Sequence, residues 1–355
     1  MTGRTTLTSA ARVVVLLLVV AAGLASIVAS GPISNTGLDQ IVFQSNRNTN
    51  WQIYKVTSDG TGETRLTANS ANDQLPQWSP DRKQILFVSN RDGNGEIYVM
   101  TADGQNQRNL TQNAAQDSGP VWSPDGRRIA FVRGLGNNAE VFVMNADGSG
   151  QTNISNHSAF DDQPAWSPDS KQVAFRSARD GNTYTIWIYQ LEAQQLRQLT
   201  RSPDSTVSPA WSPDGAQIAY VRAFVGREDA ELWVVNADGT SGGAVMITER
   251  TRALARPAWG GLVDVSIPKR IVYEDYGTGT AQLYVRIFES PPRTVRLTND
   301  AFANTNPSWA PFDTFVLFES ARDGSNVDLY RVNAAEGGNL LRVTTSPGID
   351  ANADW

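Results

Sequence analysis

The sequence predicts an all-β fold, a seven-bladed β-propeller, because a tryptophan recurs at a nearly fixed interval along the chain. The intervals are 44, 44, 45, 48, 50 and 46 residues, a period typical of propeller blades. Short apolar segments bounded by turn residues lie between the tryptophans, which indicates strands. The tryptophans are Trp78, Trp122, Trp166, Trp211, Trp259, Trp309 and Trp355.

Each tryptophan marks the first strand of a repeat. Six of the seven have proline two positions earlier, and Ala353 takes this place before the last. Ser-Pro-Asp follows in four copies, which is turn chemistry that ends the strand. These copies start at Ser79, Ser123, Ser167 and Ser212. We expect the indoles to pack between neighbouring blades rather than to form an aromatic ligand platform, because all seven occupy one position of the repeat.

Two further strands are predicted after each tryptophan. The first set lies at 85–88, 129–132, 173–175, 218–221, 271–273 and 316–318. The second set lies at 97–100, 141–144, 186–189, 232–235, 283–285 and 329–332. Asp-Gly pairs at 92–93, 180–181 and 323–324 separate the two sets and suit tight hairpin turns, so the sets should pair antiparallel.

A short fourth strand completes the repeat. Further Asp-Gly pairs at 59–60, 103–104, 147–148 and 238–239 lead to Leu-Thr-like segments near Leu66, Leu110, Leu199 and Leu297. Runs such as 85–88 are apolar at consecutive positions, so both faces of each sheet must be covered. Radially stacked blades meet that requirement.

The two ends of the array complement each other. The repeats begin at residue 41 with a post-tryptophan strand and stop at Trp355 with a tryptophan strand. A C-terminal inner strand should therefore join three outer strands from 41–67 in a seventh blade. Such closure removes the exposed sheet edges that the alternative, an open solenoid, would leave.

An N-terminal hydrophobic helix is predicted ahead of the propeller. Arg4 and Arg12 precede the apolar run 13–29, which is a secretory pattern and also near the lower limit of a membrane span. The predicted organisation is a signal peptide or membrane anchor at 1–30, a linker at 31–40 and the propeller at 41–355. Both alternatives predict an extracytoplasmic domain that is periplasmic, secreted or anchored through 13–29.

Composition excludes several classes of function. A net charge of −6 argues against binding nucleic acid or anionic lipid. The chain has no cysteine and a single histidine, His157, so we expect no metal and no cofactor. His157 lies near Ser158 and Asp161 without a nucleophile elbow, and we interpret it as a loop residue.

The acidic residues suggest two kinds of site, a calcium loop and a catalytic carboxylate pair. Asp92, Asn94 and Glu96 alternate like the start of a calcium loop but lack its glycine, so a hairpin turn is the better interpretation. Paired carboxylates for glycan cleavage stay open among the 36 acidic residues, because that chemistry depends on separation in space. No catalytic residue is predicted.

The repeat resembles a known family. Trp-Ser-Pro-Asp-Gly, then Ile-Ala-Phe, Asp-Gly, Ile-Tyr-Val-Met and Asp-Gly, is similar to the WD-repeat-like blades of TolB-like proteins, over about residues 41–355. The match is weaker from 260, where Gly260-Gly261 replaces Ser-Pro. TolB itself has an N-terminal α/β domain and six blades, and this chain is expected to lack that domain. The resemblance implies the fold more specifically than the function.

One set of loop residues forms a candidate binding site. Five residues before each tryptophan stand Asp73, Asp117, Asp161, Thr206, Leu254, Asn304 and Asp350. Arg201, Arg250, Arg252 and Arg256 fall on the adjoining loops. In a closed ring the aspartates occupy four consecutive blades, which would divide one rim into acidic and basic arcs that dock a polar partner. The alternative interpretation is that the aspartates cap turns and the arginines are solvated.

These features favour a non-enzymatic binding scaffold of the cell envelope that acts as a monomer. The expected partner is an envelope or secreted protein, or a polar ligand such as a glycan. The alternative is a carboxylate-based glycan hydrolase or lyase acting in the central pocket, since propellers host both kinds of function.

Overall fold

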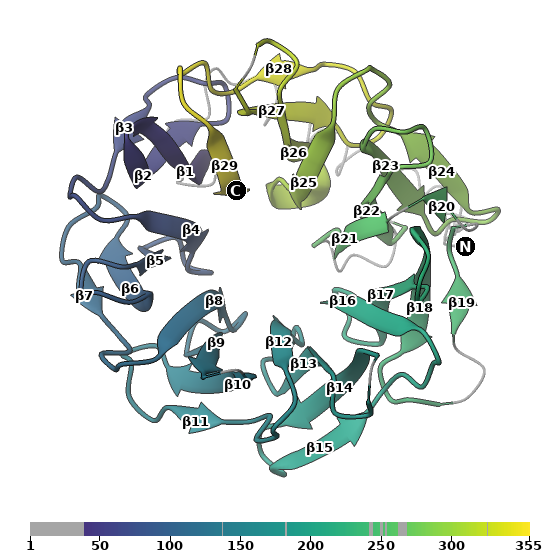
Figure 1. Cartoon of the computed structure of the whole chain (residues 1–355). Coiled ribbons are helices and arrows are strands. Elements are labelled where there is room, and N and C mark those ends of the chain that lie inside the picture. The colour runs from purple at the N-terminus through teal and green to yellow at the C-terminus, as the bar shows by residue number, and fades with distance from the viewer. Residues whose placement is uncertain are drawn as a thin grey trace, which may run out of the picture. The chain divides into compact units, whose positions relative to one another are not determined.

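Seven antiparallel sheets form a closed ring (Figure 1). In six of them the strands follow chain order from the centre outward, and in the seventh the C-terminal strand β29 is innermost, followed by β1, β2 and β3. The computed structural model describes residues 39–136, 138–181, 183–240, 244–248, 251–252, 254–261, 268–324 and 326–355, excluding the side chains of Leu135, Thr251, Arg252, Leu254 and Ala255. The predicted seven-bladed propeller is therefore confirmed. The predicted N-terminal helix and the run 13–29 lie outside the described residues.

We number the blades by the chain order of their second strands. Blade 1 contains β29 (Asp350–Asp354), β1 (Gln40–Asn48), β2 (Asn50–Thr57) and β3 (Thr64–Arg65). Blade 2 contains β4 (Asp73–Trp78), β5 (Gln84–Ser89), β6 (Glu96–Thr101) and β7 (Arg108–Asn109). Blade 3 contains β8 (Gln116–Trp122), β9 (Arg128–Leu135), β10 (Asn138–Asn145) and β11 (Thr152–Asn153). Blade 4 contains β12 (Asp161–Trp166), β13 (Gln172–Ser177), β14 (Thr185–Gln190) and β15 (Gln195–Gln198).

The remaining three blades follow the same plan. Blade 5 contains β16 (Ser205–Trp211), β17 (Gln217–Ala223), β18 (Asp229–Asn236) and β19 (Val245–Met246), and β20 (Thr251–Arg252) also pairs with β18. Blade 6 contains β21 (Leu254–Trp259), β22 (Arg270–Asp275), β23 (Gln282–Ile287) and β24 (Arg293–Arg296). Blade 7 contains β25 (Asn304–Trp309), β26 (Phe315–Ser320), β27 (Asp328–Asn333) and β28 (Leu341–Arg342), with a 3-10 turn at Pro311–Asp313.

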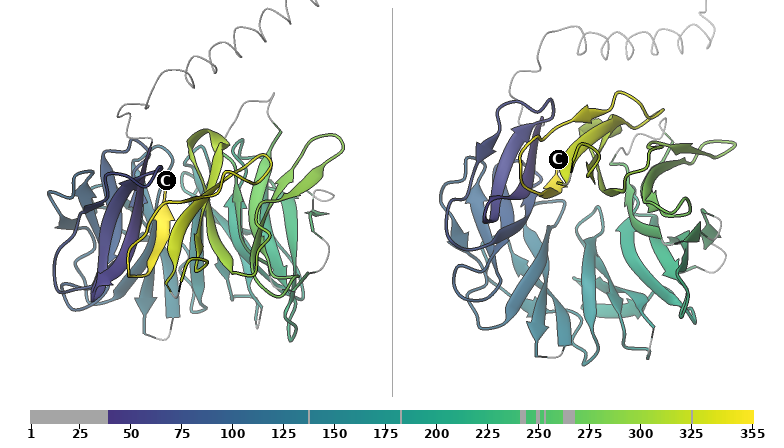
Figure 2. Two further views of the ribbon diagram at one scale, coloured as in Figure 1. Left: turned by 90° about the horizontal axis from the view of Figure 1, so that it is seen from above. Right: turned by 45° about the horizontal axis from the view of Figure 1, so that its top comes forward.

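Ring closure follows the prediction. The C-terminal strand β29 pairs antiparallel with β1, placing Gln44 opposite Ala351 and Ser45 opposite Asp350. Residues 40 and 354 therefore belong to one sheet, and the side view in Figure 2 shows that sheet standing beside its neighbours. Pairing of the two ends of the array supplies the inner strand that blade 1 otherwise lacks.

The tryptophans pack between blades, as predicted. Trp78 is 6% exposed and clusters with Val42 and Ile53 of the preceding blade. Four of the indoles also donate a hydrogen bond to a main-chain carbonyl of the preceding inner strand; Trp166 Nε1, for example, lies 3.1 Å from Val121 O. The indoles thus join successive sheets by apolar contact, and these four add a directed hydrogen bond.

The turns follow the expected chemistry, with one difference in the outermost strands. Ser79 Oγ donates to Asp81 Oδ1 at 2.7 Å inside the first Ser-Pro-Asp turn. The fourth strand of blade 2 ends at Asn109, just before Leu110, whose N–H bonds Ile97 O at 2.8 Å. The Leu-Thr segment therefore follows the outer strand rather than forming it. Within the described residues, no helix has the length and apolar character needed to cross a membrane.

Candidate functional site

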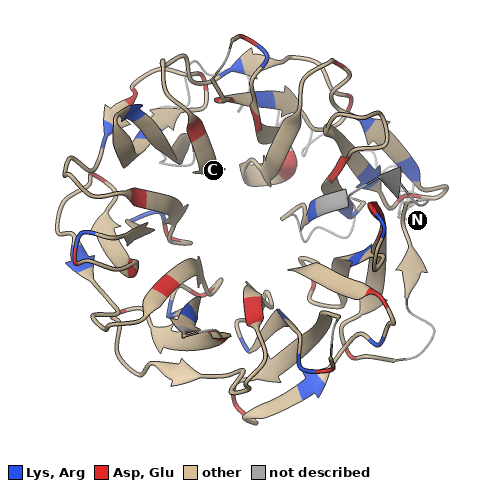
Figure 3. Ribbon diagram, in the orientation of Figure 1, with Lys and Arg blue, Asp and Glu red and all other residues tan. Residues whose placement is uncertain are grey.

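The four aspartates of the predicted acidic arc are interior residues. Asp73, Asp117, Asp161 and Asp350 begin or lie next to the start of an inner strand and are each 0% exposed. Figure 3 shows acidic residues at these inner strands. Each is paired with an arginine, at 3.0 Å for Arg91–Asp73, 2.8 Å for Arg133–Asp117, 3.1 Å for Arg179–Asp161 and 2.9 Å for Arg47–Asp350. The expectation of an exposed acidic rim is corrected, since these carboxylates are bonded inside the blades.

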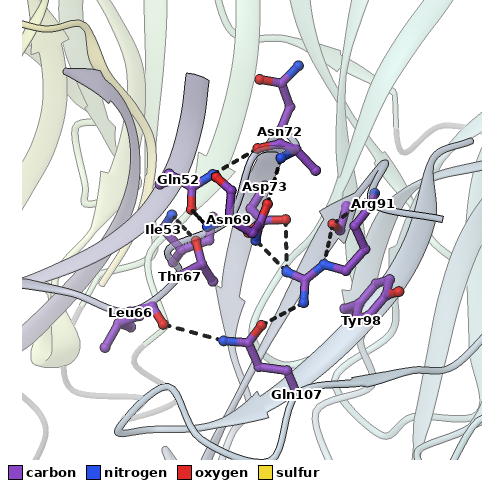
Figure 4. Close-up of polar contacts among 12 residues, drawn as sticks. Gln52, Ile53, Leu66, Thr67, Asn69, Asn72, Asp73, Arg91, Tyr98 and Gln107 are labelled. Atoms are coloured by element: carbon purple, nitrogen blue, oxygen red, sulfur yellow. Dashed lines mark hydrogen bonds and ion pairs between the residues drawn. The ribbon is translucent and has the colours of Figure 1, made fainter. Parts of the chain in front are cut away.

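The contacts of Asp73 show what these pairs do (Figure 4). Its carboxylate accepts bonds from Arg91 at 3.0 Å and from Asn69 Nδ2 at 2.6 Å. Arg91 also bonds Ser89 Oγ and Gln107, and its guanidinium lies 4.6 Å from the Tyr98 ring centroid. The aspartate therefore joins the loop before its blade to the hairpin of that blade, a structural role.

Three of these four arginines, all but Arg133, share a sequence signal, which also occurs at Arg322 of blade 7. Serine stands two residues before the arginine at the end of the second strand in four blades, and each serine hydroxyl accepts a bond from the arginine Nε. The pairs are Ser45–Arg47, Ser89–Arg91, Ser177–Arg179 and Ser320–Arg322. The Ser-x-Arg repeat was not used in the sequence prediction.

The four predicted arginines do not form a continuous basic arc among the residues that the structure describes. Arg201 is exposed on the loop between blades 4 and 5. Arg250 lies outside the described residues, and Arg252 is described only by its backbone in β20. Arg256 lies on inner strand β21 and lines the central cavity. Of the eight predicted residues, the structure therefore places Arg256 at a cavity.

A bulge recurs in every inner strand. The residue three positions before each tryptophan has φ between 49° and 56°, and the register of the adjoining strand shifts at the same place. These bulge residues are Leu75, Gly119, Gln163, Ser208, Arg256, Asn306 and Asn352. Glycine and asparagine tolerate this left-handed conformation, whereas leucine and arginine are strained in it. Because all seven blades share this conformation, the bulge is a feature of the repeat.

Five of the seven bulge residues, all but Gln163 and Ser208, line one cavity of about 290 Å³ at the centre of the ring. The wall comes from five inner strands, those of blades 1, 2, 3, 6 and 7. It contains Leu75, Pro76, Gln77, Gly119, Pro120, Val121, Arg256, Asn306, Pro307, Ser308, Asn352, Ala353 and Asp354. Arg256, Asn306, Asn352 and Asp354 give one side polar character, while Leu75, Pro76, Pro120 and Val121 give the other side apolar character.

Two buried glutamates support the polar side. Glu274 Oε1 accepts the Asn306 N–H at 2.7 Å and Glu274 Oε2 accepts the Tyr276 hydroxyl at 3.1 Å. Glu319 Oε1 accepts the Asn352 N–H at 2.7 Å. In blade 1 the equivalent acceptor is Gln44, 2.8 Å from the Leu75 N–H. Each acceptor thus bonds the bulge of the next blade.

Burial dominates the titration of both glutamates. Glu274 is 2% exposed, and loss of solvation raises its pKa above the ordinary value, opposed by the Asn306 N–H, the Tyr276 hydroxyl and the charge of Arg256. Glu319 is 7% exposed, and burial likewise raises its pKa against the Asn352 N–H, the Asn306 side chain and Arg256. Asn306 therefore contacts both carboxyl groups.

Asp354 is a third acid with a raised pKa. Burial raises its pKa to about 6, against the opposing effects of the Trp78 N–H and the charge of Arg82. The Trp78 N–H donates to Asp354 Oδ2 at 2.8 Å, a bond between the inner strands of blades 1 and 2. The acid therefore lines the cavity and also joins the closing strand to the next blade.

Sequence reasoning missed Glu274 and Glu319. They are the fifth residue of the second strand of their blades, where blades 2, 3 and 5 have Val88, Val132 and Val221. A glutamate in an otherwise apolar strand was a usable signal, but its link to Asn306 depends on how neighbouring blades pack.

Two other predicted residues lie away from this cavity. His157 is exposed in the loop between β11 and β12, where its N–H approaches Glu140, which agrees with its interpretation as a loop residue. Asp92 accepts bonds from Asn109 and Tyr98 in the β5–β6 hairpin. In the part of the chain that the structure describes, no three His, Cys, Asp or Glu residues are grouped as metal ligands, so we derive no step through a metal.

The fold and the cavity define a class, a seven-bladed propeller with a polar pocket on its axis. Models of the TolB beta propeller domain match residues 26–137, 114–259 and 182–355. The chain belongs to the TolB beta-propeller domain family.

Solved structures support the fold. TolB from Acinetobacter baumannii is 21% identical with a TM-score of 0.55, covering 72% of this chain and 63% of its own. An oligogalacturonate lyase in complex with manganese is 16% identical with a TM-score of 0.69, covering 84% of this chain and 87% of its own. The lyase from Vibrio parahaemolyticus is 15% identical with a TM-score of 0.66, covering 83% and 86%. No curated protein matches the chain.

Proposed function

We propose that the protein is an extracytoplasmic, non-enzymatic scaffold of the cell envelope that binds a polar ligand in its central cavity. The ligand is a glycan or part of an envelope or secreted protein. The observation that carries this proposal is the cavity of about 290 Å³, which has apolar residues on one side and Arg256 with two asparagines on the other. Concave sites with a few convergent polar groups are typical of ligand binding.

The chemistry of the wall supports binding rather than catalysis. Both oxygens of Glu274 accept hydrogen bonds, and Glu319 accepts the N–H of the Asn352 bulge. The two glutamates thus hold the inner strands at their bulges. The targeting pattern of Arg4, Arg12 and the run 13–29 supports a place outside the cytoplasm.

A cavity-filling variant tests the binding site. Leu75 lines the cavity with 38% of its surface exposed, so Leu75→Trp should occupy space without breaking core packing. We expect it to reduce capture of envelope proteins or glycans by about 10-fold or more, because the bulky ring excludes the ligand. Val225→Trp is the matched control, since Val225 is 62% exposed and does not line the cavity.

Capture is measured by pull-down from envelope extract and by a glycan array. Equal loss of capture in both tryptophan variants, or unchanged capture in both, would place the binding site elsewhere. Fusion of alkaline phosphatase after residue 355 tests export, because the reporter is active only outside the cytoplasm. An inactive fusion would contradict the extracytoplasmic location.

A glycan hydrolase or lyase is the second candidate function. The observation that favours it is the pair Glu274 and Glu319, two buried carboxyl groups with raised pKa that both contact Asn306 beside the cavity. A protonated acid beside an ionised one is the arrangement that glycan cleavage uses. Turnover of polygalacturonate that Glu274→Gln abolishes would establish this function in place of the scaffold.

A further inference from the structure

Arg256 is the positively charged residue among those that line the central cavity. Its side chain is exposed and lines the cavity, and among the described residues it has no hydrogen bond or ion pair. Asn306 and Asn352 line the same cavity at the equivalent bulge positions of the next two blades. A guanidinium flanked by amide groups offers the fork of N–H donors that binds a carboxylate.

The opposite wall limits the rest of the ligand. Leu75, Pro76, Pro120 and Val121 line it. A carboxylate attached to a body with an apolar face therefore fits both walls, and the volume of about 290 Å³ limits the bound part to a small unit. Sugar acids and the carboxyl ends of apolar amino acids share this chemistry.

The two glutamates couple the site to protons. If Glu274 and Glu319 were both ionised, two negative charges would stand against the single positive charge of Arg256 and would repel an anion. Burial favours the neutral forms of both glutamates. The groups that favour their ionised forms are Arg256, the Tyr276 hydroxyl, the N–H groups of Asn306 and Asn352, and the side-chain amide of Asn306. Asp354 on β29 lines the cavity itself, and the charge of Arg82 acts on it. A bound carboxylate would raise the cost of ionising these acids further.

We propose that the polar side of the cavity is a proton-coupled carboxylate site, in which Arg256 contacts the carboxylate of the ligand while Glu274 and Glu319 hold protons. The ligand chemistry is an organic monocarboxylate with an apolar face. This inference rests on the proposed function and names the ligand class of the same cavity.

Calorimetry with matched probes tests the site on the full propeller. Glucuronate is compared with glucose, and N-acetyl-leucine with N-acetyl-leucinamide, so that each pair differs in the carboxylate. We expect at least one acid to bind, with its neutral partner about 10-fold or more weaker. Affinity should be higher at pH 5.5 than at pH 7.5, with proton uptake seen as a heat that depends on the buffer. Binding of glucuronate would identify the ligand class as a sugar acid, and binding of N-acetyl-leucine would identify it as the carboxyl end of a peptide.

Three variants separate the roles. Arg256→Gln should lose about 10-fold or more in affinity for the acid. Glu319→Gln keeps an acceptor for the Asn352 N–H, as Gln44 does for Leu75, and should bind the acid with a smaller pH dependence than the wild type, because Glu274 is then the one glutamate of the pair that still titrates. Arg201→Gln, on an exposed loop outside the cavity lining, should bind like the wild type.

The outcomes distinguish the two proposals. Failure of every acid to bind, equal binding of acid and neutral partner, or full binding by Arg256→Gln would overturn the carboxylate site. If Leu75→Trp still loses its capture of envelope material in that case, the scaffold proposal stands without this ligand class. Tighter binding at higher pH would overturn the proton coupling.

Discussion

Asp354 is the cavity acid whose titration has the clearest consequence for stability. Its pKa is raised by burial to about 6 from the ordinary 3.8. The folded protein therefore holds a proton that the unfolded chain releases between pH 4 and 6. Stability from this group is fully present below about pH 4 and falls as pH rises through 6.

Asp354→Asn should stabilise the protein at pH 7.5. The amide oxygen still accepts the Trp78 N–H, and no buried charge forms, so we expect a gain of about 1–3 kcal/mol at pH 7.5 and little change at pH 4. Urea unfolding at both pH values measures the difference. Asp59→Asn is the control, and it should destabilise the protein at pH 7.5. Hydrogen bonds from Thr57 and Thr61 lower the pKa of Asp59 to about 2, so its ionised form stabilises the fold. An equal gain in the free energy of unfolding of Asp354→Asn at both pH values would contradict the raised pKa of Asp354.

Within one blade, the buried Arg–Asp pair holds the hairpin against the start of the inner strand. Arg91 is the partner of the fully buried Asp73, and the same pair recurs in three other blades. Blade 6 has Leu254 and Gly277 at the two corresponding positions, so a blade can form without either charge. The pair therefore matters most when one member is lost and the other stays buried.

Arg91→Met should destabilise the protein by about 3–5 kcal/mol, because it leaves the carboxylate of Asp73 buried without its cation. The double variant Arg91→Met with Asp73→Asn should recover most of that loss, as no uncompensated charge remains. Arg201→Met, at an exposed site, should change stability little. Chemical denaturation gives all three values, and a double variant as unstable as Arg91→Met would contradict a role for the buried charge.

The strands were predictable from the sequence, and the contacts between them were less so. The tryptophan interval and the apolar segments located the inner and middle strands because each blade repeats one local pattern. The burial of Asp73 was not foreseen, because its partner Arg91 stands 18 residues later and reaches it only after the hairpin folds. Arg256 was predicted as a binding residue and lines the cavity, while Glu274 and Glu319 depend on packing between blades.

At the scale of the whole molecule, everything proposed for the cavity depends on closure of the ring. Strand β29 supplies Asn352, Ala353 and Asp354 to the cavity wall. The seven blades surround one axis (Figure 1), so a chain that left β29 unpaired would lose Asn352 and Asp354 from the polar side of the cavity and would expose the edge of β1.

A disulfide across the closing pair tests this arrangement most directly. Gln44 and Ala351 are opposite residues of β1 and β29. The natural chain has no cysteine, so the double variant Gln44→Cys with Ala351→Cys contains two cysteines and can form a single intramolecular disulfide. Opposite residues of antiparallel strands are about 4.5–5.5 Å apart between Cα atoms, within the range that a disulfide spans. Gln44→Cys with Ala165→Cys, on β12 of blade 4, is the control.

The measurement is mass spectrometry of the oxidised, folded monomer. Closure predicts a disulfide linking positions 44 and 351 within one chain, formed in the native state, largely lost when oxidation is carried out in concentrated urea, and absent from the control pair. Free thiols at 44 and 351 in the folded monomer, or disulfides only between chains, would contradict the closed ring and with it the cavity.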